Sequence, residues 1–269
     1  KSTIASAFSP DGKMVATTHG DHTVKLSCCH SGRLLRVLRG HPRTPWTVKF
    51  HPTDSRLLAS GCLGCTVRVW DGETGKCLHT ASASGSIISL AFHPDDGLLA
   101  VAAGIFVYLW DYKNWREPLP AYKHNHTLRC VCFPPGHAGR SLIIGGANYS
   151  PGDPALAGRG GGGAAGRGGA TDGGGGGFGS GFGGSGGSSG GGGGGGAGGG
   201  SGRERRDMLF SLLLCDFDLA KAADMTAAST CPCAAAITNP RRVLSRALLY
   251  NDGGFDVSAC GRFVVACAE

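Results

Sequence analysis

Ala7-Phe8-Ser9-Pro10 is the first of four similar segments that decide the fold of this chain. The others are Lys49-Phe50-His51-Pro52, Ala91-Phe92-His93-Pro94 and Cys132-Phe133-Pro134-Pro135, and successive Phe residues lie 42, 42 and 41 residues apart. A period of this size marks supersecondary units that cannot bury their apolar faces alone and therefore stack. Each Pro lacks a backbone N–H, so it ends a strand and starts a turn.

Past its Pro, each unit continues with the same order of signals. Turn residues such as Asp11-Gly12 lead to short apolar runs such as Met14-Val15-Ala16, and an alternating strand follows, as in 67–71 and 107–111. Four short strands in about 40–45 residues, with Gly-His early and Trp-Asp late, are typical of a WD40 propeller blade. We therefore expect an all-β fold, a partial WD40 β-propeller of about four blades plus the start of a fifth.

The second unit has both signature pairs of a blade, Gly40-His41 early and Trp70-Asp71 late. We expect His41, Ser60 and Trp70 to form a buried hydrogen-bond chain, with Asp71 following Trp70 at the end of the strand. Gly64 stands where the first unit has Asp21, so the chain lacks its fourth, acidic member. These residue types indicate a structural role and not a catalytic one.

The composition changes abruptly after residue 150. From Gly160 to Gly202, 29 of 43 residues are Gly, without the strict three-residue period of collagen. Such a segment loses much backbone entropy on ordering and offers few side chains to bury. Its arginines are too sparse for an RNA-binding Arg-Gly tract, and we expect a disordered linker.

The linker interrupts a unit. Residues 129–133 and 141–144 have the form of the first two strands of unit four, and Leu212–Asp216 has the form of Val67–Asp71 with Cys215 in the place of Trp70. Residues 256–266 resemble the opening of unit one. We expect N-terminal blades in 1–150, the linker in 151–206, and the rest of blade four with the start of blade five in 207–269. An amphipathic helix over 207–223 is the alternative.

Five partial units are too few for a ring that commonly needs about seven blades. An open array would also leave sheet edges exposed to pairing with other chains. We expect the sequence to be a fragment of a longer protein, with completion of the ring by a second chain as the alternative.

The sequence has no apolar stretch long enough to cross a membrane and no signal peptide, so we expect a cytoplasmic or nuclear protein. Several of its 12 cysteines sit inside strand patterns and are expected to be small buried hydrophobes in a reducing compartment: Cys130, Cys132, Cys215, Cys260 and Cys267. Cys62, Cys65, Cys77 and His79 could be drawn as a zinc site, but no second close pair faces Cys62 and Cys65. We expect no metal and no cofactor.

The net charge of +7 is uneven. Residues 1–150 hold 16 Lys and Arg against 9 Asp and Glu, and the basic residues are densest at Arg33, Arg36, Arg39, Arg43 and Lys49. Such a surface can attract nucleic acid or phosphorylated peptides, although a solvated face is the simpler interpretation. No hydrolase elbow, phosphate-binding loop or metalloprotease helix motif occurs, so we expect a non-enzyme.

Several segments carry a family resemblance. Residues 40–53, with Arg43-Thr44-Pro45-Trp46, resemble the Gly-His-Arg-Arg-Thr-Pro-Trp segment of the Ambra-type WD40 proteins. The run Trp110–Pro118 is similar to that family's Trp-Asp-Trp…Arg-Arg-Glu-Pro. Residues 215–219 and 250–258 resemble the point where the C-terminal half of the family resumes after a long disordered insertion.

The resemblance implies a substrate receptor of cullin-4-type RING ubiquitin ligases with a role in autophagy. Such a receptor docks on the ligase's adaptor and holds a target near the charged enzyme. Candidate protein-binding residues are Arg43, Trp46, Trp110, Asp111, Lys113 and Arg116. The Trp-Asp-x-Arg adaptor box has Glu73 and Lys113 in the place of its Arg, so only the second box is charge-compatible. For Trp46, packing inward beneath Pro45 is the alternative.

Overall fold

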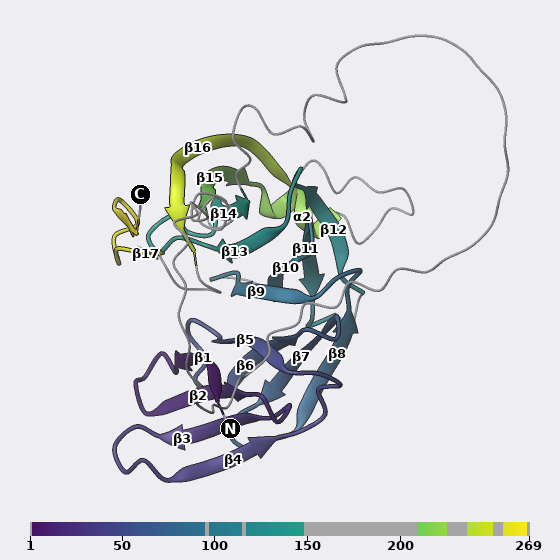
Figure 1. Cartoon of the computed structure of the whole chain (residues 1–269), viewed down its shortest axis with the longest axis vertical. Coiled ribbons are helices and arrows are strands. Elements are labelled where there is room, and N and C mark those ends of the chain that lie inside the picture. Colours follow the sequence, from purple (N-terminus) through teal and green to yellow (C-terminus); the bar gives the residue numbers. More distant parts are fainter. Residues whose placement is uncertain are drawn as a thin grey trace, which may run out of the picture. The chain divides into compact units, whose positions relative to one another are not determined.

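The computed structural model describes residues 2–94, 97–114, 117–147, 209–224, 236–249 and 255–267. Within these ranges the chain forms four four-stranded antiparallel sheets and one two-stranded hairpin, in agreement with the predicted all-β partial propeller (Figure 1). No helix in the described ranges is long and apolar enough to cross a membrane. The predicted linker, 151–206, lies outside the described residues.

We call the four sheets blades one to four. Blade one is β1 (Thr3–Phe8), β2 (Met14–His19), β3 (Val24–Cys28) and β4 (Leu34–Leu38). Blade two is β5 (Pro45–Phe50), β6 (Leu57–Cys62), β7 (Thr66–Asp71) and β8 (Cys77–Ser82). Blade three is β9 (Ile87–Phe92), β10 (Leu98–Ala103), β11 (Phe106–Asp111) and β12 (Leu119–Lys123). Blade four is β13 (Leu128–Cys132), β14 (Ser141–Ala147), β15 (Leu209–Phe217) and β16 (Ile237–Leu248).

Blade four is assembled from two separate parts of the sequence. β14 pairs antiparallel with β15, with Ser141 opposite Asp216, Leu142 opposite Cys215 and Ile144 opposite Leu213. The same register joins Leu58 to Trp70 in blade two and Leu99 to Trp110 in blade three. The prediction that the insertion falls between the second and third strands of unit four is confirmed, and Cys215 occupies the Trp position.

The alternative of a helix over residues 207–223 is wrong for most of its length. Residues 209–217 form β15, and a helix, α2 (Leu219–Asp224), begins only after that strand. The apolar run forms a strand because both faces of β15 are buried in blade four. Phe210 and Leu212 lie in one core cluster, and Cys215 and Phe217 lie in another.

The predicted start of a fifth unit is also confirmed, because β17 (Phe255–Val257) and β18 (Val264–Ala266) form a hairpin. Its turn repeats that of blade one. The N–H of Ser258 donates to the carbonyl of Phe263, as Ser9 does to Met14, and Ser258 Oγ accepts from the Phe263 N–H, as Ser9 Oγ does from Met14. Both turns contain a glycine in the left-handed conformation at the corresponding position, Gly12 with φ 70° and Gly261 with φ 72°.

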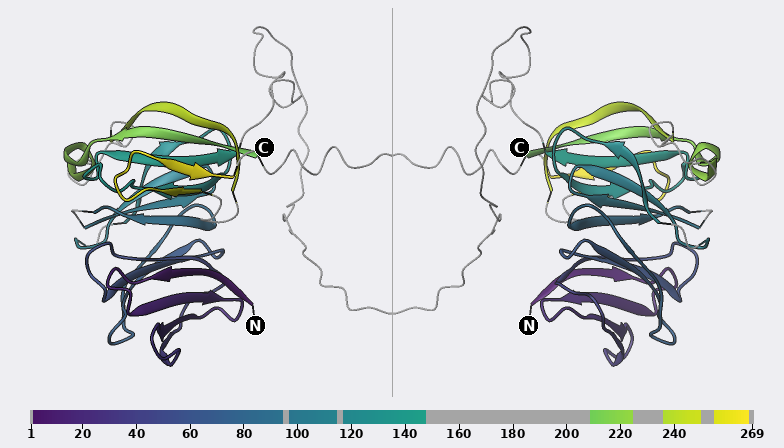
Figure 2. Two further views of the ribbon diagram at one scale, coloured as in Figure 1. Left: turned by 90° about the vertical axis from the view of Figure 1, so that its left-hand side faces the viewer. Right: turned by 90° about the vertical axis from the view of Figure 1, so that its right-hand side faces the viewer.

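Successive blades meet along their first strands. β1 lies beside β5, β5 beside β9 and β9 beside β13, and the sheets follow one another in this order in two views (Figures 1 and 2). The repeated Phe-x-Pro segments form the joints. The ring of His51 in blade two lies 5.2 Å from that of Phe92 in blade three, and His93 lies 5.0 Å from Phe133 in blade four. The period seen in the sequence is therefore the period of blade contacts.

Candidate protein-binding sites

The signature residues of blade two form the expected hydrogen-bond chain. His41 precedes β5, Ser60 lies on β6 and Trp70 on β7, and all three are buried. The indole N–H of Trp70 donates to Ser60 Oγ at 2.8 Å, and Ser60 Oγ lies 2.6 Å from His41 Nε2. This chain ties three segments of one sheet together, which is a structural role.

The absence of the acidic member of the hydrogen-bond chain affects the surroundings of His41. Within the described part of the chain, His41 Nδ1 is buried and has no hydrogen-bond partner. Burial, with the nearby Arg68, lowers the pKa of His41 to about 4, so the ring is neutral at pH 7. Gly64 packs against Pro42, and a Cβ at Gly64 would lie 3.0 Å from Pro42 Cγ. Blade two thus closes this turn with apolar contact in place of a carboxylate.

Arg43 and Trp46 lie in and just after the loop that enters blade two. Arg43 is exposed, while Trp46, the second residue of β5, is half-buried. The indole nitrogen of Trp46 is buried without a hydrogen-bond partner among the described residues, and Pro45 before it is buried too. The loop therefore presents the Arg43 guanidinium and part of the Trp46 ring to solvent, with the polar edge of that ring turned inward.

The Trp-Asp turns place only part of the candidate adaptor box at the surface. Trp110 is 2% exposed and belongs to the core, while Asp111 is half-buried and Lys113 exposed. Asp111 accepts hydrogen bonds from the backbone and side-chain N–H groups of Asn114, at 3.1 and 2.7 Å. Arg116 lies outside the described residues. Lys113 is thus the described member of this set that a partner can reach.

The matching turn of blade two is similar in structure and opposite in charge. Asp71 accepts hydrogen bonds from the N–H groups of Glu73 and Thr74. Burial raises the pKa of Asp71, but these hydrogen bonds outweigh it, so the net effect lowers that pKa. Glu73, in the position of Lys113, is paired with Arg56 at 3.6 Å. In both blades the Asp carboxylate, Asp71 or Asp111, stabilises the turn through hydrogen bonds. The exposed residue two positions later, Glu73 or Lys113, gives the two turns opposite charges.

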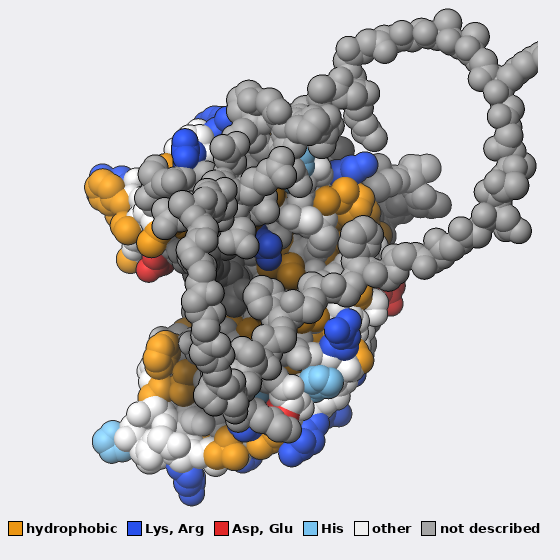
Figure 3. Space-filling view, in the orientation of Figure 1, with side chains coloured by type: hydrophobic (Ala, Val, Ile, Leu, Met, Phe, Trp, Pro, Cys, Tyr) orange, Lys and Arg blue, Asp and Glu red, His pale blue; other side chains and the backbone are white. Residues whose placement is uncertain are grey.

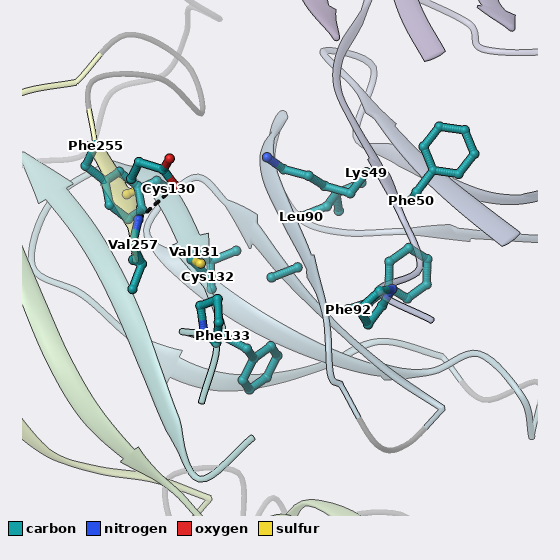
Figure 4. Close-up of a pocket in the computed structure, with 14 residues that line it drawn as sticks. Lys49, Phe50, Leu90, Phe92, Cys130, Val131, Cys132, Phe133, Phe255 and Val257 are labelled. Carbon is teal, nitrogen blue, oxygen red and sulfur yellow. Dashed lines mark hydrogen bonds between the residues drawn. The ribbon is translucent and has the colours of Figure 1, made fainter. Parts of the chain in front are cut away.

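A pocket of about 280 Å³ lies among the first strands of units two to five. It is lined by Lys49 and Phe50 of β5, Leu90 and Phe92 of β9, Cys130 to Phe133 at β13, and Phe255 to Val257 of β17. Figure 4 shows the Lys49 side chain extending into the space between β5 and the β17 hairpin. The residues of three Phe-x-Pro segments contribute, including Pro52 and Pro135.

The sequence pattern did not predict this pocket. The Phe-x-Pro period could have indicated it, because strands that end in the same periodic motif come to lie side by side once the units stack. Most of its lining residues are of apolar type, and Lys49 and Asp256 supply one charge of each sign. Such a pocket suits an apolar side chain of a protein partner with a polar group nearby.

The cysteines divide by position. Cys130 and Cys215 are buried as expected, and burial raises the pKa of Cys215 to about 12. The expectation is wrong for Cys260 and Cys267, which are exposed because Cys260 lies in the β17–β18 turn and Cys267 follows β18. No group of three or more metal-ligating side chains is found among the described residues, which include Cys62, Cys65, Cys77 and His79.

The basic residues of blade one lie at and near its outer strand. Arg33, Arg36 and Arg39 flank or belong to β4, and they and Arg43 are exposed. None of the four forms an ion pair with another described residue, and Arg36 donates instead to the backbone carbonyls of Leu35 and Glu73, at 2.8 and 3.0 Å. These guanidinium groups are therefore gathered at the surface with no acidic partner in the described part of the chain.

Comparison with known proteins agrees with the repeat. The family described as "WD domain, G-beta repeat" matches residues 2–26, 32–71 and 75–111. Two similar zebrafish (Danio rerio) proteins are "Activating molecule in BECN1-regulated autophagy protein 1A", 39% identical over 152 residues, and protein 1B, 40% identical over 152 residues. The alignments cover 55% of this chain but only 12% and 11% of those relatives. Subunit I of eukaryotic translation initiation factor 3 from Pyricularia oryzae is 33% identical over 88 residues, 33% of this chain and 26% of that protein.

The stacked four-stranded sheets and the matched repeats show the fold of a partial WD40 β-propeller. Within that class, the chain is similar to the two zebrafish proteins over 55% of its own length.

Proposed function

We propose that this chain is a non-catalytic WD40 scaffold that takes part in the regulation of autophagy, as a substrate receptor of a cullin-4-type RING ubiquitin ligase. The observation that carries the proposal is the 39–40% identity to the two autophagy proteins over 152 residues. The division of blade four supports it, since an Ambra-type protein is expected to interrupt its propeller in this way.

The surface of the blades is suited to binding and not to chemistry. Exposed turns carry Arg43 and Lys113, and residues of mostly apolar type line the pocket among the first strands. A receptor contributes by raising the local concentration of a target at the ligase, which requires contact surfaces and no reactive group. In this proposal Lys113 contacts an acidic group of the adaptor, and the Arg43–Trp46 loop or the pocket holds the target.

The test is affinity purification of the full-length protein from cells, with the recovered cullin-4 ligase adaptor quantified by mass spectrometry. We expect Lys113→Glu to lower adaptor recovery at least tenfold, because it reverses the exposed charge of the box. Lys123→Glu, which reverses an exposed charge on β12, is the matched control and should leave recovery unchanged. A wild-type protein that recovers no adaptor would refute the receptor role.

A second candidate function rests on the exposed arginines near β4, which form no ion pair with another described residue. Their charge favours binding of RNA or phosphorylated peptides, with an affinity that falls as salt increases. A filter-binding assay at low salt tests this, with Arg33→Glu/Arg36→Glu/Arg39→Glu as the variant expected to lose retention. Absence of retention by the wild-type protein would eliminate this function and leave the receptor proposal intact.

A further inference from the structure

Ser245 differs from the other hydroxyl-bearing residues of the chain in what precedes it. The segment Arg241-Arg242-Val243-Leu244-Ser245 places one arginine four positions and a second three positions before the serine. Among all Ser and Thr residues of the 269-residue sequence, Ser245 is the only one with Arg or Lys three positions before it. Arginine-directed protein kinases select a basic residue at this distance, through carboxylates that face the arginine side chain.

The structure places this segment at an accessible edge of a sheet. β16, which contains it, is the outer strand of blade four and pairs with β15 alone among the described strands (Figure 1). Arg241, Arg242 and Ser245 are all exposed, and Lys and Arg side chains are visible at the surface over β16 (Figure 3). Each described blade has its fourth strand at the edge of the sheet, so this accessibility is a property of the blade itself.

The pairing of β16 is irregular at Ser245. Ser245 and Arg246 of β16 both stand opposite one residue of β15, Ser211, which is the arrangement of a β-bulge. The register shifts again at Val243. A bulge interrupts the ladder of hydrogen bonds, and an outer strand is held by a single ladder, so this segment opens locally at a lower cost than a central strand. Ser245 can therefore reach the active site of a kinase while the blades stay folded.

We propose that Ser245 is the phosphorylation site of an arginine-directed serine/threonine kinase. In the transfer, Ser245 Oγ attacks the γ-phosphorus of ATP, and the bond from that phosphorus to the bridging oxygen of ADP breaks. The hydroxyl proton passes to a base of the kinase, and ADP leaves. This chain supplies the hydroxyl group and the two arginines, and the site does not depend on the proposed receptor function.

The modification changes the charge of this edge. β16 contains three arginines and no acidic residue, which gives it a formal charge of +3. Arg241 is paired with Asp216 at 2.7 Å, whereas Arg242 forms no ion pair with a described residue. A phosphoserine carries about −1.5 to −2 charges at pH 7, so phosphorylation lowers the charge of β16 to about +1. An acidic partner of this strand would then bind less tightly.

The experiment treats the folded full-length chain with γ-labelled ATP and a panel of purified arginine-directed kinases, which includes the catalytic subunit of the cyclic-AMP-dependent kinase. We expect at least one of them to label the chain, with Ser245 as the main site in mass spectrometry. Ser245→Ala and Arg242→Ala should each lower incorporation at least tenfold, and the second variant keeps the hydroxyl group in place. Ser31→Ala and Arg39→Ala, matched changes at exposed residues of blade one, should leave it unchanged.

A synthetic peptide of residues 237–249 separates recognition of the motif from access in the folded chain. We expect the same kinase to label the folded chain at a rate within tenfold of that of the peptide. A folded chain that is labelled more slowly than this would overturn the proposal, because the strand would then be closed to the kinase. Failure of every kinase in the panel, a main site other than Ser245, or full incorporation in Arg242→Ala would overturn it as well.

Discussion

Blade two and blade four have the same strand register although their signature residues and their continuity in the sequence differ. Blade two is continuous in sequence and contains a buried hydrogen-bond chain of His41, Ser60 and Trp70. Blade four joins two distant segments and has the buried Cys215 in the place of Trp70. Both nevertheless form four antiparallel strands. The register is therefore set by the alternating apolar residues of the strands, and the signature residues add stability to a sheet that the pattern already specifies.

The largest effect is expected from a charge in the core of blade four. Leu212 is fully buried on β15, opposite Gly145, and Leu212→Asp places an unpaired carboxylate there. We expect a loss of about 4 kcal/mol or more, enough to detach β15 and β16. Hydrogen exchange should show lost protection in 209–217 and 237–248 while blade two keeps its protection. Simultaneous loss in both blades would mean that they unfold as one unit.

Removing the hydroxyl at the centre of the blade-two chain should cost less. Ser60→Ala leaves both Trp70 Nε1 and His41 Nε2 without their shared partner, and we expect about 2–3 kcal/mol of destabilisation. Urea unfolding measures it. Val101→Ala, at the corresponding position of β10, removes apolar contact without breaking a hydrogen bond and serves as the comparison. If the free-energy losses of Ser60→Ala and Trp70→Phe simply add in the double variant, the two residues do not act as a coupled unit.

The buried histidine should make blade two sensitive to acid. Because the folded pKa of His41, about 4, lies below the usual value of 6.5, the unfolded chain binds a proton first as the pH falls. Stability is therefore lost from about pH 6.5 toward pH 4, by about 2 kcal/mol at pH 5. His41→Gln should show a correspondingly smaller loss between pH 7.5 and 5 in urea unfolding. Other histidines contribute equally to both proteins, so an unchanged pH dependence would contradict the assignment.

The smallest effect on stability is expected from chemical modification of the cysteines, whose reactivity should differ between blade four and the last hairpin. Cys215 in the Trp position of blade four should resist iodoacetamide, because burial raises its pKa and excludes the reagent. Cys260 is exposed, and hydrogen bonds, first from the Ser258 hydroxyl, lower its pKa. Mass spectrometry of briefly treated native protein should find Cys260 modified before Cys215, with little change in stability. Rapid modification of Cys215 would mean that blade four opens readily.

The blades and the way in which they stack could be predicted from the sequence alone. The Phe-x-Pro period predicted the stacking, and the likeness of Leu212–Asp216 to Val67–Asp71 predicted the pairing of β15 with β14. The His41–Ser60–Trp70 chain was also predicted, because a polar residue at each of three fixed positions has few other uses inside a sheet.

Other features depended on geometry that a linear pattern does not contain. Exposure of Cys260 follows from its place in a turn, although its neighbours alternate like a strand. The inner pocket needs four strands from four units at once. The burial of Trp110 and the exposure of Lys113, three residues apart, could be separated only when the end of β11 was known.

The division of blade four also sets an order of events during protein synthesis. β14 emerges from the ribosome long before its partner β15, because residues 148–208 are made in between. At roughly 5–20 residues per second, this delay lasts several seconds. A nascent chain with blades one to three complete would carry an unpaired strand edge for that time, and a chaperone that shields such an edge would raise the yield of this protein more than that of an uninterrupted propeller.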